Sequence, residues 1–439
     1  MKVKRLGMLL AVTLAASACS STGSSAAPSG SGGTANCSGV TLTLATIQDP
    51  VSDGVKALAP IWEKNTGGKF SIVESPYADL YSKLVTAFQA NDSTYDLVLL
   101  DDPWMPKFGT MNALADLGAL GVQKDPDIAQ IVWDVGTWPP PSGPVPPSEK
   151  GKAQKLLAVT STGNVQMFMW RKDLVPDAPK TYTDVLNNGK AQNKSNFAGY
   201  LIRGKATNPV VADFLPILWS FGGDVFDQNW NVVFNSDKSL AAVKFLVEDL
   251  KSIAQADPAS SDAGDRDRLM AIGQGFQSSF WPGEVSNVLG QGSTVVGKIG
   301  FAPIPGGPNG TPGAGMMGNW MLAIPAASKN QACAADFIKF SLLKESQLTA
   351  ANAGGIPSRT SVLKDPSLAQ KYPQYAVLAD ALQAPPKWRP RTDQWNQVET
   401  IIGTHLNAAL AGSESAQDVV TKASAEIRTL MQGAGYPTQ

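Results

Sequence analysis

From residue 40 onward, short apolar runs alternate with longer segments whose apolar residues recur at helical spacing. The alternation predicts strands at 40–45, 70–73 and 97–100 and helices at 53–65 and 77–88. The last run, Leu-Val-Leu-Leu, holds no polar residue, which is typical of a parallel strand buried on both faces. This β-α-β-α-β start predicts an α/β fold with an open parallel sheet and helices on both sides. Ligands in such a fold lie beyond the carboxyl ends of the strands.

The regular alternation stops between residues 133 and 155 and then resumes. Residues 138–147 read Trp-Pro-Pro-Pro-Ser-Gly-Pro-Val-Pro-Pro, which favours extended polyproline geometry, so we expect a surface loop. A second α/β unit follows, with predicted strands at 156–159, 165–170, 200–202 and 276–280 and predicted helices at 209–221 and 236–256. The last quarter is mostly helical, with predicted helices at 331–343, 395–410 and 416–431.

The composition allows a large core and argues against several classes of function. With 439 residues, of which 43% are hydrophobic, the chain is long enough for two or three domains. The formal net charge of −1 gives no reason to expect nucleic acid as a partner. His405 is the only histidine, so a Ser-His-Asp triad, a histidine-rich zinc site and a histidine proton shuttle are all improbable. We expect no cofactor and no metal site.

The N-terminus has the three regions of a secretory signal. Basic residues precede an apolar run from residue 6 to 16, and small residues then lead to Cys19. The run is too short to be a transmembrane helix. The segment resembles a bacterial lipobox, which implies a signal peptide at 1–18 and acylation of Cys19. A lipid on Cys19 would hold the protein outside the cytoplasm, anchored to the outer face of the cell membrane. Plain secretion is the alternative.

The residues after Cys19 predict a spacer, and the two remaining cysteines are either bonded to each other or unpaired. Ser, Gly, Ala, Thr and Pro make up almost all of residues 20–35, so we expect a flexible linker over 19–37. If Cys19 is acylated, Cys37 and Cys333 remain. In an oxidising compartment they can form a disulfide that ties the N-terminal strand to a later helix. Two unpaired cysteines, one of them buried, are the alternative.

Carboxylate and aromatic side chains follow the predicted strand at 97–100. Asp101, Asp102 and Trp104 come directly after it, so we expect them at the ligand-facing edge of the sheet. Sugars suit such residues, because hydroxyls bind carboxylates and amides whereas C–H faces pack on flat rings. The alternative for Asp102 is that it caps a helix whose first residue is Pro103. Further candidates are Glu74 and Tyr77 after the second strand, and Asn164 and Gln166 between the two units.

Seven short motifs stand in order along the chain. They are WEKNTG at 62–67, YDLV at 95–98, FMWRKDL at 168–174, LWSFGGD at 218–224, VFNS at 233–236, NWMLAI at 319–324 and AGGIPSR at 353–359. Together they resemble the family 1 extracellular solute-binding proteins of bacterial ABC importers, the carbohydrate-binding group that includes maltose-binding protein. Two features depart from that family: Trp170-Arg171 stands where members usually carry Tyr-Asn, and residues 139–147 look like an insertion.

The resemblance implies a fold, a mode of binding and a set of partners. The fold is the two-lobed type II periplasmic-binding-protein fold, in which each lobe is an open sheet flanked by helices and the ligand is held between lobes that close about a hinge. The implied lobes are 38–157 with 298–345, and 158–297 with 346–439. The resemblance also implies a monomer without enzymatic activity, which binds a small carbohydrate and delivers it to the transmembrane subunits of an ABC permease.

Other candidate site residues come from the resemblance or from their place in the second half. Trp281 resembles the position of an aromatic platform on the second lobe, and Arg389 resembles part of a loop that reaches the cleft. Arg389 can donate to two vicinal hydroxyls, and a surface arginine paired with an acid is the alternative. Asn319 and Trp320 precede a predicted strand, where a core tryptophan is the alternative. The acidic segment 262–267 lacks the glutamate of a calcium loop, so we expect a solvated loop.

Three functions remain open from the sequence. The leading hypothesis is an importer's binding protein for a monosaccharide, an oligosaccharide or a polyol. A lipid-anchored glycoside hydrolase is one alternative, because paired carboxylates and stacking tryptophans serve both roles. The other is a receptor for a non-sugar solute such as a polyamine, which requires several acids around an ammonium group.

Overall fold

The computed structural model describes residues 35–384 and 386–438. The predicted signal peptide, Cys19 and the linker as far as residue 34 lie outside the described residues. Within the described ranges, no helix combines the length and the apolar character needed to cross a membrane.

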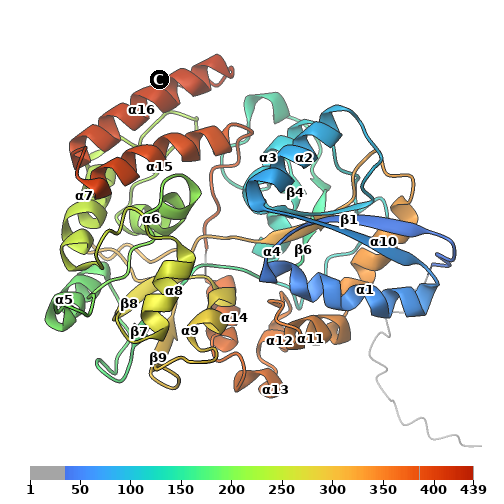
Figure 1. Ribbon diagram of the computed structural model, residues 1–439. Helices are drawn as coiled ribbons and strands as arrows, with labels where there is room; N and C mark the ends of the chain where they lie inside the picture. Colours follow the sequence, from blue (N-terminus) through green and yellow to red (C-terminus); the bar gives the residue numbers. More distant parts are fainter. Residues whose placement is uncertain (1–34, 385, 439) are drawn as a thin grey trace, which may run out of the picture. The chain divides into compact units, whose positions relative to one another are not determined.

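A five-stranded sheet forms around the N-terminal β-α-β-α-β segment (Figure 1). Its order is β2 (Lys69–Ser75), β1 (Thr41–Ile47), β3 (Leu97–Asp101), β10 (Trp320–Ala323) and β6 (Ala158–Thr160). β1 is parallel to β2 and β3, whereas β10 is antiparallel to both of its neighbours. α1 (Asp53–Thr66) and α2 (Tyr77–Gln89) lie on opposite sides of this sheet (Figure 1). The predicted strands and helices are confirmed here, and β3 is buried along its whole length.

A second sheet is antiparallel throughout. It has the order β8 (Gln277–Phe280), β7 (Met167–Arg171) and β9 (Ile299–Ala302). The helices that follow β7 in the chain are α5 (Tyr182–Gln192), α6 (Asn208–Ser220), α7 (Asp237–Lys244), α8 (Ala263–Ala271) and α9 (Val285–Val288). A π-helical turn at Phe245–Leu250 continues α7, so the predicted helix at 236–256 is shorter and less regular than expected. The predicted strand at 200–202 is wrong, since Tyr200 forms only an isolated bridge with Ala254.

The last quarter of the chain is mostly helical, as expected. Its helices are α10 (Gln331–Ser341), α11 (Lys344–Asn352), α12 (Thr360–Leu363), α13 (Pro366–Ala369), α14 (Tyr375–Gln383), α15 (Trp395–Ala411) and α16 (Ala416–Gly433). Shorter elements complete the first half: the helices α3 (Met105–Thr110) and α4 (Gln130–Asp134), and the strand pair β4 (Thr137–Trp138) and β5 (Lys155–Leu156).

The strand pairing differs from the expected division into lobes. Residues 298–345 were expected with the first sheet, but β9 pairs with β7 in the second. Conversely, residues 158–160 were expected in the second lobe, but β6 pairs with β10 in the first sheet. Local sequence pattern identifies a strand without identifying its partner, which here lies more than 100 residues away.

Two buried clusters form the core. One contains the first sheet, one face of the second sheet and the helices between residues 344 and 383; the other contains α6, α7, α15 and α16. The stretch expected as a single C-terminal part of lobe two, 346–439, is therefore divided between the clusters. A disulfide joins Cys37 to Cys333, with their Cα atoms 5.9 Å apart, and so ties the segment before β1 to α10.

The proline-rich segment 138–147 is more than a surface loop. Trp138, Pro139 and Pro140 are buried. Trp138 Nε1 donates to Glu149 over 3.2 Å, and Trp230 Nε1, from the second cluster, donates to the Val145 carbonyl over 3.0 Å. The segment therefore connects the region of the first sheet to the second core.

Candidate functional site

The carboxyl end of β3 holds two buried aspartates with different partners. The Asp101 carboxylate accepts from Tyr77 Oη and from the Asp102 N–H, both over 2.9 Å. Asp101 therefore caps the following 3-10 turn, whereas the capping alternative in the sequence analysis was Asp102. Asp102 instead accepts from Arg389 Nη1 over 2.5 Å, and its N–H donates to the Asn319 carbonyl over 3.0 Å. The Asp102 Oδ2 atom has no hydrogen-bond partner among the described residues.

Arg389 connects this strand end to helices of the second cluster. Its Nε lies 3.6 Å from Glu399 Oε1 on α15, and Asn208 at the start of α6 donates to the same Glu399 oxygen over 3.1 Å. Arg391 donates to two backbone carbonyls, of Val135 over 2.7 Å and of Asp102 over 3.4 Å. We call Tyr77, Asp101, Asp102, Arg389, Arg391 and Glu399 the β3-end cluster. Arg389 is thus a buried arginine with acidic partners, rather than a surface one.

Aromatic rings pack beside the β3-end cluster. The Trp104 ring centroid lies 4.8 Å from that of Tyr77, 5.3 Å from that of Tyr81 and 5.7 Å from that of Trp320. Trp104 is 1% exposed and Trp320 is 7% exposed, so both are buried in this structure. The two rings lie at the edge of the first sheet, as predicted from the sequence, and they pack against one another there.

Three buried amide side chains lie where the chain passes between the sheets. Asn164 Nδ2 donates to the Gly318 carbonyl over 2.9 Å, and Asn319 Nδ2 donates to the Thr162 carbonyl over 2.8 Å. Gln166 Nε2 donates to Asp213 Oδ1 over 2.6 Å. We call these three residues the crossing amides.

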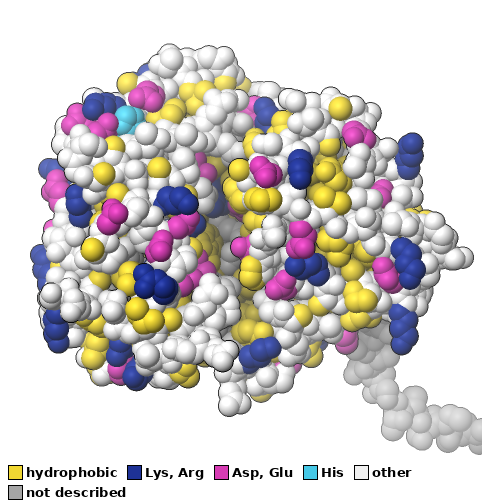
Figure 2. Space-filling model, viewed as in Figure 1, with side chains coloured by type: hydrophobic (Ala, Val, Ile, Leu, Met, Phe, Trp, Pro, Cys, Tyr) yellow, Lys and Arg dark blue, Asp and Glu magenta, His cyan; other side chains and the backbone are white. Residues whose placement is uncertain are grey.

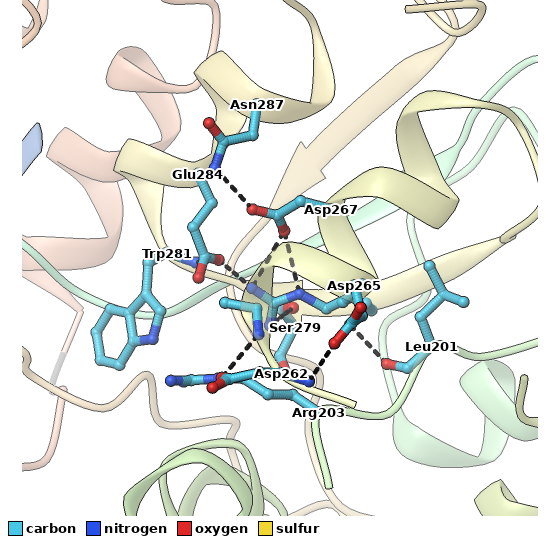
Figure 3. A network of polar contacts seen from close by, with 12 residues as sticks. Leu201, Arg203, Asp262, Asp265, Asp267, Ser279, Trp281, Glu284 and Asn287 are labelled. Atoms are coloured by element: carbon cyan, nitrogen blue, oxygen red, sulfur yellow. Dashed lines mark hydrogen bonds and ion pairs between the residues drawn. The ribbon is translucent and has the colours of Figure 1, made fainter. Parts of the chain in front are cut away.

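A second charged group surrounds Arg266 on α8. Figure 3 shows its neighbours Asp267, Ser279 and Glu284. Arg266 contacts three carboxylates: Asp213 at 3.1 Å, Asp267 at 3.3 Å and Glu284. It also donates to the Ser279 carbonyl over 3.0 Å. The prediction of a solvated loop at 262–267 is wrong, because Asp262 caps α8 and Arg266 is fully buried.

The Arg266 cluster, as we call it, extends from the buried Arg266 to the exposed Lys205. It comprises Arg203, Lys205, Asp213, Asp262, Arg266, Asp267 and Glu284. Trp281 is its half-buried aromatic neighbour: its N–H donates to Glu284 over 2.8 Å, and the two side chains stand side by side in Figure 3. The Trp281 ring also covers Gly318, where a Cβ would lie only 2.4 Å from it.

Burial dominates the electrostatics of both clusters. Burial raises the pKa of Asp102 to about 7, although the Arg389 guanidinium opposes the shift. Burial also raises the pKa of Glu399 and that of Asp213, again against nearby arginines. The pKa of Asp267 rises to about 6, by burial first and then by the charge of Glu284. The carboxylates are therefore only partly compensated by the guanidinium groups around them.

The crossing amides, the β3-end cluster and the Arg266 cluster form one connected polar region. Asp102 contacts Asn319, Gln166 contacts Asp213, and Trp281 covers Gly318 between them. Figure 2 shows a hollow in one face of the molecule, with hydrophobic, acidic and basic side chains along its edges. A connected set of carboxylates, amides and tryptophans of this kind binds polar solutes.

The structure excludes one of the sequence candidates from the candidate site and adds further residues to the site. Glu74 does not join the others: it is exposed and pairs with Lys56 over 2.9 Å. The residues that sequence reasoning missed are Arg391, Glu399, Asn208, Asp213, Arg203, Arg266 and Glu284. Most of them lie on helices, where a charged residue ordinarily reads as part of a solvated face, so no local signal marks them.

Comparison with known proteins identifies the family. The chain matches the family of bacterial extracellular solute-binding proteins over residues 41–348. It belongs to that family. As a solute-binding protein of an ABC transporter it is a transport protein, not an enzyme.

This solute-binding protein is similar to two curated relatives and to two solved structures. A probable amino-acid ABC transporter periplasmic-binding protein of Sinorhizobium fredii is 26% identical over 84% of each chain. A probable ABC transporter-binding protein of Deinococcus radiodurans is 27% identical over 88% of this chain and 90% of its own. The maltose-bound MalE3 of T. maritima is 26% identical, with a TM-score of 0.76 over 89% of this chain and 100% of that one. A ribitol complex from Agrobacterium radiobacter is 24% identical, with a TM-score of 0.77 over 90% and 99%.

The comparisons agree with the described architecture. The neighbours share the two-lobed α/β fold that the sequence predicted, with a sheet flanked by helices in each lobe.

Proposed function

We propose that this solute-binding protein captures a carbohydrate or polyol between its two sheets and delivers it to an ABC permease. The proposal rests mainly on the half-buried Trp281, which lies beside buried carboxylates and amides. A flat ring next to hydrogen-bonding groups matches the two surfaces of a sugar. The maltose and ribitol complexes among its structural neighbours support the same class of ligand.

The ligand-binding residues we propose come from both sequence and structure. They are Tyr77, Asp101, Asp102, Trp104, Asn164, Gln166, Trp281, Asn319, Trp320 and Arg389 from the sequence, with Asp213 and Glu399 added from the structure. Glu74 is left out because Lys56 occupies its carboxylate. The hydrogen bonds between the two sides close the region, so we infer that the lobes part to admit the ligand.

We also propose how the protein is held near its permease. Acylated Cys19 would anchor a monomer to the outer face of the cell membrane. The spacer that the sequence predicts over 19–37 would end before Ala35, because the Ala35 N–H already donates to Asp336 over 3.0 Å. The disulfide at Cys37 then ties the start of the folded part to α10. This arrangement keeps the binding protein within reach of the transmembrane subunits.

A thermal-shift screen tests the class of ligand. The purified protein is melted with mono- and disaccharides, polyols, amino sugars and polyamines, because a ligand that binds only the folded state raises the melting temperature. We expect a shift with a member of the sugar or polyol group, lost in Trp281→Ala and kept in Leu174→Ala, an exposed site used as the control. A shift with polyamines alone, or none with any carbohydrate, would refute the proposal.

A further inference from the structure

The charges of the two clusters do not balance. The β3-end cluster holds three carboxylates, Asp101, Asp102 and Glu399, against two guanidinium groups. The Arg266 cluster holds four carboxylates against Arg203, Lys205 and Arg266. Each cluster therefore has one more carboxylate than cations. Unpaired charge in a buried region is costly, so it is removed either by a proton, as the raised pKa values of Asp102 and Asp267 show, or by a partner with positive charge.

The crossing amides point to a ligand that donates hydrogen bonds. In Asn164 and Asn319 the amide nitrogen must face a backbone carbonyl, and in Gln166 it must face the Asp213 carboxylate, so the orientation of each amide is fixed. Their oxygens, Asn164 Oδ1, Asn319 Oδ1 and Gln166 Oε1, are buried and accept from nothing in residues 35–384 and 386–438. All three side chains are at least 94% buried.

Together with Asp102 Oδ2, the region offers four buried oxygens that lack a donor, beside two buried N–H groups, Arg389 Nε and Arg391 Nε, that lack an acceptor and suit the hydroxyls of the same ligand. Gln166 places one of these four oxygens near the Arg266 cluster. Its amide nitrogen donates to Asp213 over 2.6 Å, so its amide oxygen, which lacks a donor, lies close to the same carboxylate. A neutral sugar offers hydroxyls, which both donate and accept. An ammonium group only donates, and it also supplies the missing charge.

We infer that the solute is a carbohydrate or polyol that carries an ammonium group, such as an amino sugar or an amino-deoxy polyol. The inference rests on the proposed function and narrows it. The ammonium group binds in the acidic region that includes Asp213 and Asp102, where carboxylate oxygens and the Gln166 oxygen accept from it. The hydroxyls donate to Asn164 and Asn319, and the C–H face lies on Trp281.

Titration calorimetry with matched ligands tests this inference. Each scaffold is supplied in aminated, hydroxyl and N-acetyl form: glucosamine with glucose and N-acetylglucosamine, and amino-deoxysorbitol with sorbitol, with putrescine as a cation without the sugar scaffold. We expect the aminated member to bind at least tenfold more tightly than its neutral counterparts. A neutral sugar that binds as tightly as its aminated form overturns the inference and leaves the proposed function standing. Binding of putrescine alone, or of no carbohydrate, overturns the proposed function and the inference with it.

Single-carboxylate variants test the same inference whichever sugar or polyol the protein binds. Asp102→Asn and Asp213→Asn each remove a charge at nearly constant size, so the preference for the aminated ligand should fall at least tenfold. Affinity for a neutral ligand should change less. Asp380→Asn, which alters an exposed carboxylate paired with Lys364, is the control. Melting curves without ligand show whether each variant is folded, and an unchanged preference in folded Asp102→Asn and Asp213→Asn overturns the inference.

Discussion

The buried pair between Asp102 and Arg389 gives a prediction whose size follows from the structure. Arg389 is 4% exposed and lies 2.5 Å from Asp102 and 3.6 Å from Glu399. Replacing it in Arg389→Gln removes the cation and leaves two buried carboxylates without it. Breaking a buried ion pair from one side costs about 3–5 kcal/mol of unfolding free energy. With an unfolding entropy of about 2.1 cal/mol/K per residue, roughly 400 folded residues convert that cost into a melting-temperature loss of about 4–6 °C.

The pKa of Asp102 predicts how that loss depends on pH. Its value of about 7 in the folded protein exceeds the ordinary aspartate value of about 3.9, so the folded state takes up a proton below pH 7. A protonated Asp102 has no charge to pair with Arg389. Because folding favours the protonated carboxyl, the stability that Asp102 contributes is present below its unfolded pKa of about 3.9 and is lost as the pH rises through 7. Arg389 limits that loss by stabilising the charged carboxylate, so removing Arg389 costs most above pH 7. The loss in Arg389→Gln should be larger at pH 8.5 than at pH 5.5.

Melting curves of the variant and the parent protein at the two pH values measure both effects. The exposed Arg268 provides the control Arg268→Gln, which should change the melting temperature by less than about 1 °C. Adding Asp102→Asn to Arg389→Gln should recover part of the loss, because one of the unpaired charges is gone. A loss in Arg389→Gln no larger than that of the control, or a loss that does not shrink at pH 5.5, would refute the reasoning.

Two further predictions concern the disulfide and the place of Trp281. Replacing both Cys37 and Cys333 by serine should lower the unfolding free energy by about 2–4 kcal/mol, because the bond closes a loop with a sequence separation of 296 residues. Equal melting temperatures of the variant and the unreduced parent protein would contradict this prediction. Gly318→Ala places a Cβ 2.4 Å from the Trp281 ring, so ligand affinity measured by calorimetry should fall about tenfold or more. Gly433→Ala, which has no neighbour within 4 Å, should bind normally, and equal affinities in the two variants would remove Trp281 from the site.

The first sheet was predictable because its elements follow one another along the chain. β1, β2 and β3 each lie one helix apart, and the apolar run of β3 is buried as expected. The second sheet was not predictable in the same way. β7 pairs with β8 and β9, which come more than 100 residues later, and no local pattern specifies that pairing. For this reason the expected boundary at residue 298 falls on the wrong side of β9.

The site residues that directly follow a strand could be predicted from the sequence, whereas those on helices could not. Asp101, Asp102 and Trp104 were found because a buried strand ends in polar residues. Arg266 and Glu399 were missed, because an acid or a base on an amphipathic helix ordinarily faces water. Only the tertiary structure shows that Arg266 is fully buried among three carboxylates.

The crystal structure of this solute-binding protein with the carbohydrate selected by the thermal-shift screen tests the central claim most directly. We predict that the ligand lies between the two sheets, with a sugar face on Trp281 and with Asn319 or Asp102 within hydrogen-bond distance of its polar groups. A carbohydrate bound elsewhere on the protein, with the contacts among Asp102, Arg389 and Asn319 unchanged, would contradict the account.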